Sequence, residues 1–414
     1  MEHDKNKVFR IEGKVQNYAW GGVSFLPNLL NIPNKDRLPF AEYWLGAHDR
    51  ASASIILDND ERKKLNEYIR QFQQETLGMY VTRRFGRLPY LLKILDIKDM
   101  LSIQVHPSKQ NAEKEFEEEN KKGIPLDAAY RNYKDDNHKP ELMLALGEFW
   151  LLHGFKPRTQ LMRTLQYIPE LNFLIPYLEK GYADLYHAVM SMDQQEVNKI
   201  LEPLLDRIIP AYQNNLLERN NENFWAARAA LIFNGKDNKP IIDRGIFSIY
   251  FFNLVHLHPG EAIFQEAGLP HAYLEGQNIE IMANSDNVLR GGLTTKHIDV
   301  GELMKHIVFK PTIPHVIHEE NKKNHISLYV TPAADFELCK LDLKKDETIS
   351  LLSSSTEIFV MLKGKALVQE NEQNEFFRTA GEAWLGFDKA TFYLKAEEDM
   401  VAYFARVPGI GDKA

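Results

Sequence analysis

The chain has 414 residues, a length at which two or three structural units are expected rather than one continuous core. Hydrophobic residues make up 44% and charged residues 26%, which is typical of globular proteins and excludes a collagen-like or wholly disordered chain. The formal net charge of -8 gives no electrostatic reason to expect nucleic acid or an anionic membrane as a partner. An anionic ligand would therefore need a locally basic pocket.

A single cysteine, Cys339, cannot form an internal disulfide, which favours a reducing compartment. It also excludes a zinc site built from several cysteines, so a bound metal would need His, Asp, Glu or Gln ligands. The polar residues 1–5 are not followed by the apolar core of a secretory signal, and no apolar run is long enough to span a bilayer. We therefore expect a cytoplasmic protein.

The first hundred residues are predicted to form mostly antiparallel sheet. Short β-type runs occur at residues 7–11 and 53–57, with Gly, Asn and Pro between them. The segment from Asn59 to about Phe72 has the apolar spacing of a charged surface helix. Apolar runs at 88–95 and 101–105 follow, and their lengths suit strands better than helices.

The middle of the chain changes from strand-like to helical patterns. Residues 109–122 predict a charged, solvated helix, and apolar residues at helical spacing between about Arg158 and Leu231 predict an inserted helical block. Four prolines are expected to interrupt that block: Pro169, Pro176, Pro203 and Pro210. Strand patterns return at residues 246–252 and continue to about Asn287. The polar stretch 318–324 is predicted to be a linker into a final all-β unit.

These patterns divide the chain into a β domain in two segments, an insertion and a C-terminal domain. The expected boundaries are 1–157 and 241–317 for the two parts of the catalytic β domain, 158–240 for the helical insertion, and 325–414 for the C-terminal β domain.

A similar sequence pattern, an internal echo, occurs in both β domains. The Gly-Glu-Ala turn at 260–262 leads to His271 and Tyr273, and a similar turn at 381–383 leads to Thr391 and Tyr393. Convergent turn chemistry could produce this echo, but true repetition is the favoured interpretation. On that interpretation the C-terminal unit is a second barrel without a metal, because Thr391 stands where His271 would be.

A metal site is the main chemical hypothesis. Gln104 and His106 are two residues apart in a predicted strand and therefore project to the same face. Pro107 ends that strand, Glu141 enters another apolar run, and His271 follows a turn much later. Two histidines, one carboxylate and one amide oxygen with an open position suit a catalytic Lewis-acid site.

His256 and His258 form a competing pair, since they also have the spacing of a metal-binding couple on one strand. A lone strand histidine is more often structural than a ligand, so each element by itself is weak evidence. The residues alone leave both sets open.

Six ordered motifs carry a family resemblance. They are Gln-Asn-Tyr-Ala-Trp-Gly at 16–21, Ala-Glu-Tyr-Trp-Leu-Gly at 41–46, Leu-Ser-Ile-Gln-Val-His-Pro at 101–107, His-Lys-Pro-Glu at 138–141, Pro-His-Ala-Tyr-Leu at 270–274, and Ser-Asp-Asn-Val-Leu-Arg-Gly-Gly-Leu-Thr at 285–294. Together they closely resemble the signatures of type I mannose-6-phosphate isomerases, from the first strand to beyond Lys296. The chain departs from the family at His48, where proline usually precedes it, and at 292–297, where proline commonly precedes the lysine.

The resemblance implies a mainly β fold with an α-helical insertion. The expected parts are a cupin, or jelly-roll, β-barrel catalytic domain and a second, C-terminal cupin-like barrel. It further implies one zinc ion per chain, held by Gln104, His106, Glu141 and His271, with Arg290 as the principal catalytic residue.

The implied reaction interconverts mannose 6-phosphate and fructose 6-phosphate through an enediol. Arg290 retains its proton, so it is assigned charge stabilisation and substrate positioning. The base candidates are Glu280, Asp286, Lys139 and His138, with Glu280 slightly favoured by the resemblance. Glu280 could instead be an ion-paired strand residue, His138 a partner of a ligand, and Asp286 a turn former.

Arg290 and Lys296 are the expected phosphate anchors, because a dianion in an acidic protein needs clustered positive charge. Lys296 could equally be a solvated surface lysine. Further pocket residues are expected among Trp20, Glu42, Lys93 and Ser102. The expected partner is a small sugar phosphate, with no nucleic acid or membrane, and the chain is expected to be a monomer or weak homo-oligomer.

Two rival functions use similar residues. A non-haem iron cupin oxygenase would also bind its metal through two histidines and one carboxylate. Gln104 and the basic pair Arg290 and Lys296 favour a sugar phosphate over oxygen chemistry. A non-catalytic sugar-binding cupin would keep a pocket without needing the metal for turnover.

Overall fold

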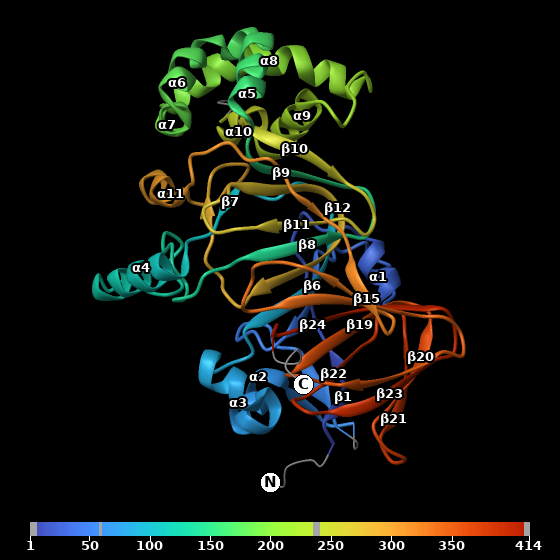
Figure 1. Ribbon diagram of the computed structural model, residues 1–414. Coiled ribbons are helices and arrows are strands. Elements are labelled where there is room, and N and C mark those ends of the chain that lie inside the picture. Colours follow the sequence, from blue (N-terminus) through green and yellow to red (C-terminus); the bar gives the residue numbers. More distant parts are fainter. Residues whose placement is uncertain (1–5, 58–59, 235–240, 410–414) are drawn as a thin grey trace.

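The computed structural model describes residues 6–57, 60–234 and 241–409. The molecule has a helical block at one end, a sheet-rich centre, and the C-terminal strands at the other end (Figure 1). No helix in the described part is both long enough and apolar enough to cross a lipid bilayer. The polar residues 1–5 and Asn59, the expected start of a helix, lie outside the described residues.

The central sheet contains the strands that carry the expected metal ligands. Among the described residues its eleven strands are β2 (Lys14–Gln16), β3 (Glu42–Gly46), β6 (Tyr90–Ile97), β7 (Gln104–Val105), β8 (Glu141–Ala145), β9 (Phe149–Phe155), β10 (Phe252–Leu257), β11 (Ala262–Gln265), β12 (His271–Ala283), β13 (Leu289–Arg290) and β14 (Val316–Ile317). The long strand β12 pairs with β6, β7, β8 and β9, all antiparallel. It therefore connects segments that are far apart in the sequence.

The C-terminal unit consists of two facing sheets. In the part of the chain described, the larger sheet has nine strands in the order β15 (Glu320–Lys323), β16 (Ile326–Tyr329), β17 (Glu337–Leu343), β24 (Met400–Arg406), β19 (Glu357–Lys363), β22 (Ala383–Gly386), β1 (Val8–Glu12), β4 (Ser54–Ile56) and β5 (Arg62–Lys64). The smaller sheet has four, in the order β18 (Thr348–Leu352), β23 (Thr391–Ala396), β20 (Lys365–Gln369) and β21 (Glu375–Thr379).

The strands β1, β4 and β5 belong to the larger C-terminal sheet, although they lie at the start of the chain. β1 pairs with β22, for example Phe9 opposite Leu385. The first domain segment and the C-terminal domain therefore share one sheet. The proposed domain boundaries remain a prediction.

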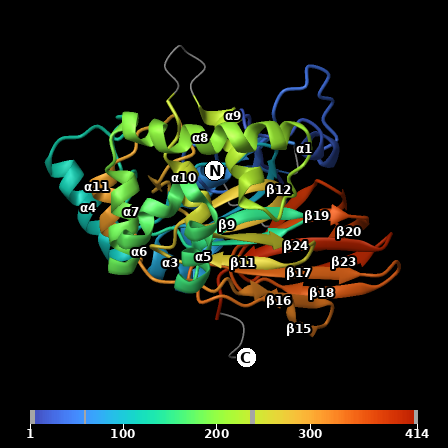
Figure 2. The same cartoon turned by 90° about the horizontal axis from the view of Figure 1, so that it is seen from above.

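Helices flank the sheets. Those outside the helical block are α1 (Phe25–Leu29), α2 (Leu65–Gln71), α3 (Gln73–Phe85), α4 (Lys109–Lys121) and α11 (Val300–His306). Figure 2 shows α4 and α11 on the same side of the molecule, and an Asn111–His306 hydrogen bond of 3.2 Å joins them. The charged helix predicted at 109–122 is confirmed.

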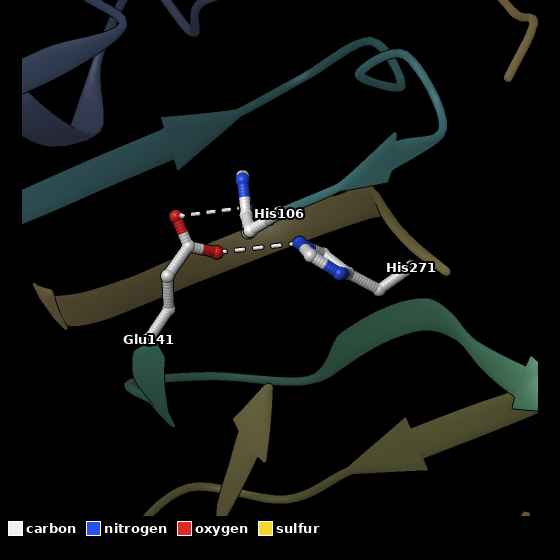
Figure 3. A group of neighbouring side chains, drawn as sticks. All are labelled: His106, Glu141 and His271. Atoms are coloured by element: carbon white, nitrogen blue, oxygen red, sulfur yellow. Dashed lines mark ion pairs between the residues drawn. The ribbon is translucent and has the colours of Figure 1, made fainter. Parts of the chain in front are cut away.

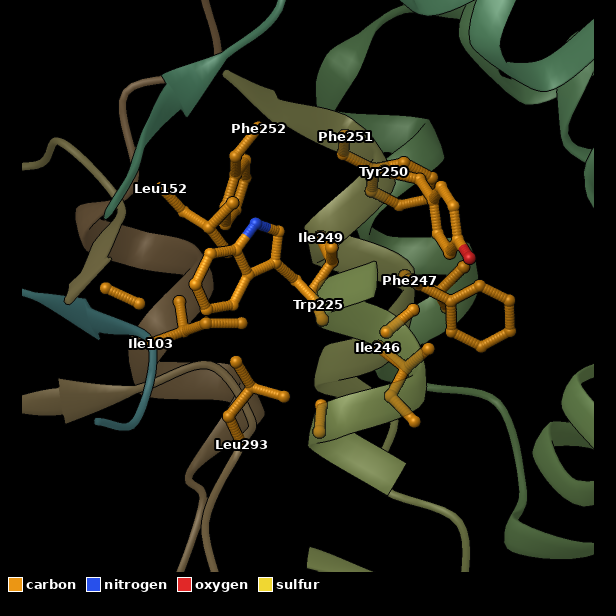
Figure 4. Close-up of a cluster of buried hydrophobic side chains, with 14 of the residues drawn as sticks. Ile103, Leu152, Trp225, Ile246, Phe247, Ile249, Tyr250, Phe251, Phe252 and Leu293 are labelled. Carbon is orange, nitrogen blue, oxygen red and sulfur yellow. The ribbon is translucent and has the colours of Figure 1, made fainter. Parts of the chain in front are cut away.

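The helical block covers β9 and β10. Its elements are α5 (Arg158–Tyr167), the 3-10 helix η1 (Pro169–Leu174), α6 (Ile175–Lys180), α7 (Tyr182–Met190), α8 (Gln194–Gln213), α9 (Glu222–Phe233) and α10 (Gly245–Phe251). Trp225 of α9 and Phe252 meet Ile103 and Leu293 in one apolar core (Figure 4). Because Ile103 precedes β7 and Leu293 follows β13, this core fixes two segments of the expected site.

Two of the four expected proline interruptions are wrong. Pro169 begins η1 and Pro176 lies in the first turn of α6, where a missing N–H is tolerated. Pro203 and Pro210, however, lie inside the continuous helix α8. The buried apolar face of α8, which includes Leu201 and Leu204, offsets the hydrogen bonds that these prolines remove.

The strand predicted at 246–252 is also wrong, because residues 245–251 form helix α10 and only Phe252 begins a strand. All seven residues of α10 are buried. A helix buried on every side has no polar face, so its sequence has the same continuous apolar pattern as a buried strand.

Two boundaries differ from expectation. The helix predicted from Asn59 begins only at Leu65, because 62–64 form β5 against β4. The predicted linker at 318–324 contains β15, which pairs with β16. Polar edge strands of this kind have no apolar alternation that would identify them. The fold class itself, mainly β with an inserted helical block, is confirmed.

Candidate metal centre and substrate site

The strands bring the expected metal ligands together. In the sheet register, Gln104 of β7 lies opposite His271 of β12 on one side and opposite Arg290 of β13 on the other. Glu141 begins β8, which also pairs with β12, opposite Met282. Four segments separated by up to 186 residues in the sequence, 104 to 290, thus meet at one place.

His106, Glu141 and His271 form a compact buried group (Figure 3). His106 Nε2 lies 3.5 Å from Glu141 Oε1, and His271 Nε2 lies 3.3 Å from Glu141 Oε2. Ligand atoms about 2 Å from a tetrahedral zinc ion are separated from one another by roughly 3.3 Å. The three side chains therefore have the spacing of ligands around one ion.

The second nitrogen of each imidazole fixes its tautomer. His106 Nδ1 lies 2.8 Å from the carbonyl of Asn287, and His271 Nδ1 lies 3.0 Å from the carbonyl of Leu269. A carbonyl oxygen can only accept, so each Nδ1–H donates and the Nε2 atom of each ring faces Glu141. Burial lowers the pKa of His106 to about 4, which keeps its ring neutral near pH 7.

This arrangement fits a cation. His106 Nε2 is buried and has no hydrogen-bond partner among the described residues. Burial opposes ionisation of Glu141, but Lys139 and the two imidazoles hold the pKa of this carboxyl well below its usual range. Two lone pairs and a carboxylate that face one another repel unless a positive ion lies between them. Gln104 lies opposite His271 in the sheet register.

Two loops, at residues 134–135 and 285–287, bind each other and position Asn287, whose carbonyl accepts from His106. Asn287 accepts from the backbone of Lys134 through Oδ1 at 2.7 Å and donates to the carbonyl of Asp135 through Nδ2 at 2.7 Å. The carboxylate of Asp135 accepts from Ser285 Oγ at 2.8 Å and from the Asp286 N–H at 2.7 Å. Asn287 and Asp135 were missed from the sequence, because neither touches the expected ligands through its side chain.

A second charged group lies between β3, β6 and β12. Lys93 Nζ lies 2.9 Å from Glu280 Oε2 and 3.7 Å from Glu42 Oε2, and the Tyr273 hydroxyl donates to Glu280 Oε1 at 3.0 Å. Burial disfavours the Lys93 ammonium, but the two carboxylates outweigh it and raise the pKa of Lys93. Trp44 Nε1 donates to Glu42.

The four base candidates have different surroundings. Glu280 is buried with Lys93, as above, and Lys139 Nζ lies 2.8 Å from Glu141 Oε1. His138 pairs with Asp335 of the C-terminal unit at 2.9 Å, so its ring is engaged away from the metal ligands. Asp286 contacts His48 at 3.4 Å and Arg50 at 2.7 Å.

Basic side chains gather near Arg290. Arg290 is half-buried, and its burial lowers its pKa; no carboxylate pairs with it among the described residues. Burial and the charges of Arg290 and Arg50 lower the pKa of the exposed Lys296. Burial, Arg131, Arg290 and Arg50 likewise lower the pKa of Lys134. Arg290 and Arg50 thus act electrostatically on Lys134 and Lys296, and these four side chains form a locally positive region in an acidic protein.

The loop after Arg290 is anchored to the helical block. Asp243 accepts from the N–H groups of Leu293 at 2.8 Å and Thr294 at 2.9 Å. Gly292 has a φ of +126°, and a β-carbon there would lie 2.4 Å from the Gly245 Cα. This close contact explains the glycine. The loop reaches this conformation without the proline that the family commonly has.

The remaining expected pocket residues are more peripheral. Trp20 stacks on Tyr18 with ring centroids 5.7 Å apart, and Ser102 lies half-buried two residues before Gln104.

His153 of β9, which the sequence reasoning missed, lies opposite His271 and is buried. Burial and the charge of His271 lower the pKa of His153 to about 4.

The competing pair does not join this site. His256 and His258 lie near Glu148 and form a separate, more exposed group. Of the two alternatives that the sequence left open, the buried set with Glu141 is therefore the one positioned near Arg290.

Comparison with known proteins gives consistent matches along the chain. The family described as "Phosphomannose isomerase type I, catalytic domain" matches residues 8–158. The mannose-6-phosphate isomerase of Salmonella typhimurium is 36% identical over 387 residues, which cover 92% of this chain and 95% of that protein. The human mannose-6-phosphate isomerase is 33% identical over 87% of this chain and 88% of its own length.

Solved structures give the same result. A mutant of phosphomannose isomerase from Salmonella typhimurium has a TM-score of 0.85 and 32% identity, with 97% of this chain and 100% of that chain covered. Mannose 6-phosphate isomerase from the same organism, bound to the substrate fructose 6-phosphate and zinc, has a TM-score of 0.83 and 32% identity, covering 96% and 99%. The chain therefore belongs to the family of type I mannose-6-phosphate isomerases, and the expectation of an enzyme is confirmed.

Proposed function

We propose that this enzyme is a zinc-dependent isomerase that interconverts mannose 6-phosphate and fructose 6-phosphate. The observation that carries the proposal is the buried group of two imidazole lone pairs and one carboxylate, His106, His271 and Glu141, which needs a cation. The relative solved with zinc and fructose 6-phosphate supports both the ion and the substrate. The oxygenase rival has no comparable support.

His106, Glu141 and His271 would hold the ion, with the amide oxygen of Gln104 as a fourth ligand. When bound, zinc supplies Lewis-acid polarisation of the sugar oxygens at C1 and C2. Asn287 and Leu269 hold the two rings in the ligating tautomer, because their carbonyls accept the Nδ1 protons.

Glu280 is the proposed base. The reaction removes the proton at C2 of the aldose and returns a proton to C1, with an enediol between these steps. Glu280 accepts one donor at each oxygen, from Lys93 and from Tyr273, and a carboxylate has further lone pairs that can take the substrate proton. His138 is a weaker candidate because Asp335 of the C-terminal unit engages its ring. Asp286, which His48 and Arg50 contact, is the main alternative.

Arg290 and Lys296 are the proposed phosphate anchors, and the surroundings add Arg50 and Lys134. The charges of Arg290 and Arg50 lower the pKa of Lys296 and of Lys134, and a phosphate dianion would relieve this repulsion. Arg290 lies beside Gln104 in the sheet and is thus also near enough to the metal centre to stabilise charge on the substrate.

The main test is removal and return of zinc. Protein treated with a chelator should lose mannose 6-phosphate isomerisation and regain it when stoichiometric zinc is added, as measured by a coupled assay and elemental analysis. Metal-free protein that keeps full activity would contradict the proposal.

The base assignment has its own test. Glu280→Gln should bind zinc normally but lose both turnover and the exchange of the substrate C2 proton with solvent, with Asp286→Asn as the matched comparison. Retained proton exchange in the Glu280 variant, with loss in the Asp286 variant, would transfer the role of base to Asp286.

A further inference from the structure

A second group of metal-binding side chains lies at the end of the β9–β10 pair. The two strands are antiparallel, with His256 opposite Trp150 and Leu257 opposite Phe149. Glu148 and His258 are the next residues on the two chains, so the same register places them opposite each other. Residues that face each other across a pair of strands have side chains in contact range. Three potential ligands therefore meet at this end of the β9–β10 pair.

The donor atoms are close enough to share one ion. His256 Nε2 lies 2.5 Å from Glu148 Oε2, and His258 Nδ1 lies 3.3 Å from Glu148 Oε1. All three donor atoms lie within 4.8 Å of one another. Around a tetrahedral zinc ion the separations would be roughly 3.3 Å, so shifts of about 1 Å in two half-exposed side chains are sufficient.

Both histidines are held in position. The His256 ring stacks on Trp150, with centroids 4.1 Å apart and planes inclined by 4°. The His258 N–H donates to Glu261 Oε2 at 2.8 Å, and its carbonyl accepts from the Glu261 N–H at 3.0 Å. Gly260, with a φ of +88°, closes this turn. The His256 ring and the His258 backbone are therefore positioned before any ion binds.

The three donor atoms differ in exposure. His256 Nε2 is shielded from solvent and contacts Glu148 Oε2 at 2.5 Å. The side chains of Glu148 and His258 are each 59% exposed, and that of His256 is 31% exposed. An ion here could thus take water or an external ligand at its remaining positions.

We propose that Glu148, His256 and His258 form a second, accessory binding site for a divalent transition metal ion such as zinc. Two imidazoles and one carboxylate are ligands suited to borderline divalent ions. The site is distinct from the group of His106, Glu141 and His271, and it does not depend on the proposed reaction. The catalytic zinc remains one per chain, and the accessory ion binds more weakly because its ligands are exposed.

The proposed role is stabilisation of the β9–β10 pair. An ion that binds the folded chain but not the unfolded chain raises the free energy of unfolding. β9 also carries His153, opposite His271, so the accessory ion would stabilise a strand that borders the catalytic centre. It would contact no residue assigned to catalysis.

Equilibrium dialysis against increasing free zinc, followed by elemental analysis, tests the proposal. Wild-type protein should show two binding steps and reach two ions per chain. His258→Ala should stop at one ion per chain and lose the zinc-dependent rise in melting temperature at the second step. His256→Phe keeps a ring on Trp150 without a ligand atom, and it should also stop at one ion.

Two controls separate this site from other binding. His187→Ala removes an exposed histidine of helix α7 and should retain both steps, whereas Glu141→Ala should lose the tighter step and keep the weaker one. A wild-type plateau at one ion per chain would overturn the proposal. So would two ions in every variant, which would mean adventitious binding elsewhere. Isomerase activity is measured separately, so failure of the proposed function would not alter the binding result.

Discussion

The segment of β11 and β12 and the segment of β22 and β23 begin with the same turn, although the two strands of each segment do not pair with each other. Gly260 and Gly381 have φ values of +88° and +87°. The following glutamate, Glu261 or Glu382, donates its N–H at 3.0 Å to the carbonyl three residues earlier. Its carboxylate accepts at 2.8 Å from the N–H of that same residue in both turns. The echo seen in the sequence is therefore a shared turn structure.

The strands after the two turns differ in what they cover. In β12 both His271 and Tyr273 are buried, because neighbouring strands and loops cover both faces of the strand. In β23 Thr391 and Tyr393 are exposed and Phe392 and Leu394 are buried. Thr391 is thus on the outer face of its sheet, and not in the interior position that the alignment with His271 would give it. The repetition of the β11–β12 segment as the β22–β23 segment remains a prediction.

The two interiors therefore contain different chemistry. The central site holds buried charges, including Glu141 and the pair Lys93 and Glu280. The C-terminal interior holds stacked aromatic rings: Phe359 lies 4.9 Å from Trp384 and 4.6 Å from Phe404, measured between centroids. We infer that one interior serves binding and chemistry, whereas the other contributes mainly stability.

Glu141→Gln should give the largest effect in the central site. The amide cannot neutralise the ion, so zinc should be lost and kcat/KM should fall by at least about 10³-fold, which corresponds to several kcal/mol of Lewis-acid stabilisation. Glu382→Gln in the C-terminal turn is the matched control and should retain zinc and activity. The comparison fails if the Glu141 variant keeps wild-type activity without zinc.

Trp384→Ala should have the largest effect in the C-terminal interior. Removal of a fully buried tryptophan is expected to lower the free energy of unfolding by about 3–5 kcal/mol. Trp384→Phe should cost less, because the indole N–H has no hydrogen-bond partner among the described residues. Denaturant titration measures both, and zinc content should stay at the wild-type value. Zinc loss from folded Trp384→Ala protein would contradict the inference that the C-terminal interior contributes stability and the central interior binding and chemistry.

Arg290→Ala should lower kcat/KM by about 10²-fold while zinc stays bound, because the side chain stabilises charge on the substrate rather than the ion. Arg290→Lys should recover little of this loss, since an ammonium cannot replace the planar guanidinium. Steady-state kinetics with elemental analysis measure both effects. Absence of zinc from the alanine variant would instead make Arg290 a structural residue.

The sequence predicted those parts of the molecule that follow local patterns or ordered motifs. The helix at 109–122, the strands near His106 and Glu141, and the helical block all have clear periodicity. The motifs identified His106, Glu141 and His271, which the fold brings into one group. Helix α10 was mistaken for a strand because burial on all sides removes its polar face.

Other features of the site could not be predicted, because they depend on contacts between distant segments. Asn287 acts on His106 through its backbone carbonyl, and the Asp135 carboxylate accepts from the backbone N–H of Asp286. Such contacts leave no spacing signal in the sequence. His153 becomes a neighbour of His271 only through the register of β9 and β12. The pairing of β1 with β22 likewise joins the two ends of the chain.

The smallest expected effect concerns Glu357 of β19. It is a buried carboxyl whose pKa is raised, whereas the pKa of Glu141 is lowered. Burial raises its pKa from an ordinary 4.5 to about 7, because Arg406 and Ser354 compensate only in part. Between these values the folded chain binds more protons than the unfolded chain, so this carboxyl makes the free energy of unfolding fall as pH rises from 4.5 to about 7.

Glu357→Gln should remove that decline, because an amide does not ionise. Relative to wild type, the variant should gain about 3 kcal/mol of stability at pH 8 and little at pH 4.5. Denaturant titrations at both values measure the difference, with Glu382→Gln as an exposed control in the same unit. A gain of the same size at both pH values would mean that the effect comes from packing and not from the titration of Glu357. Arg406 compensates the ionisation of Glu357 only in part, so this charge destabilises the C-terminal interior, whereas ionisation of Glu141 in the central site would provide the proposed metal ligand.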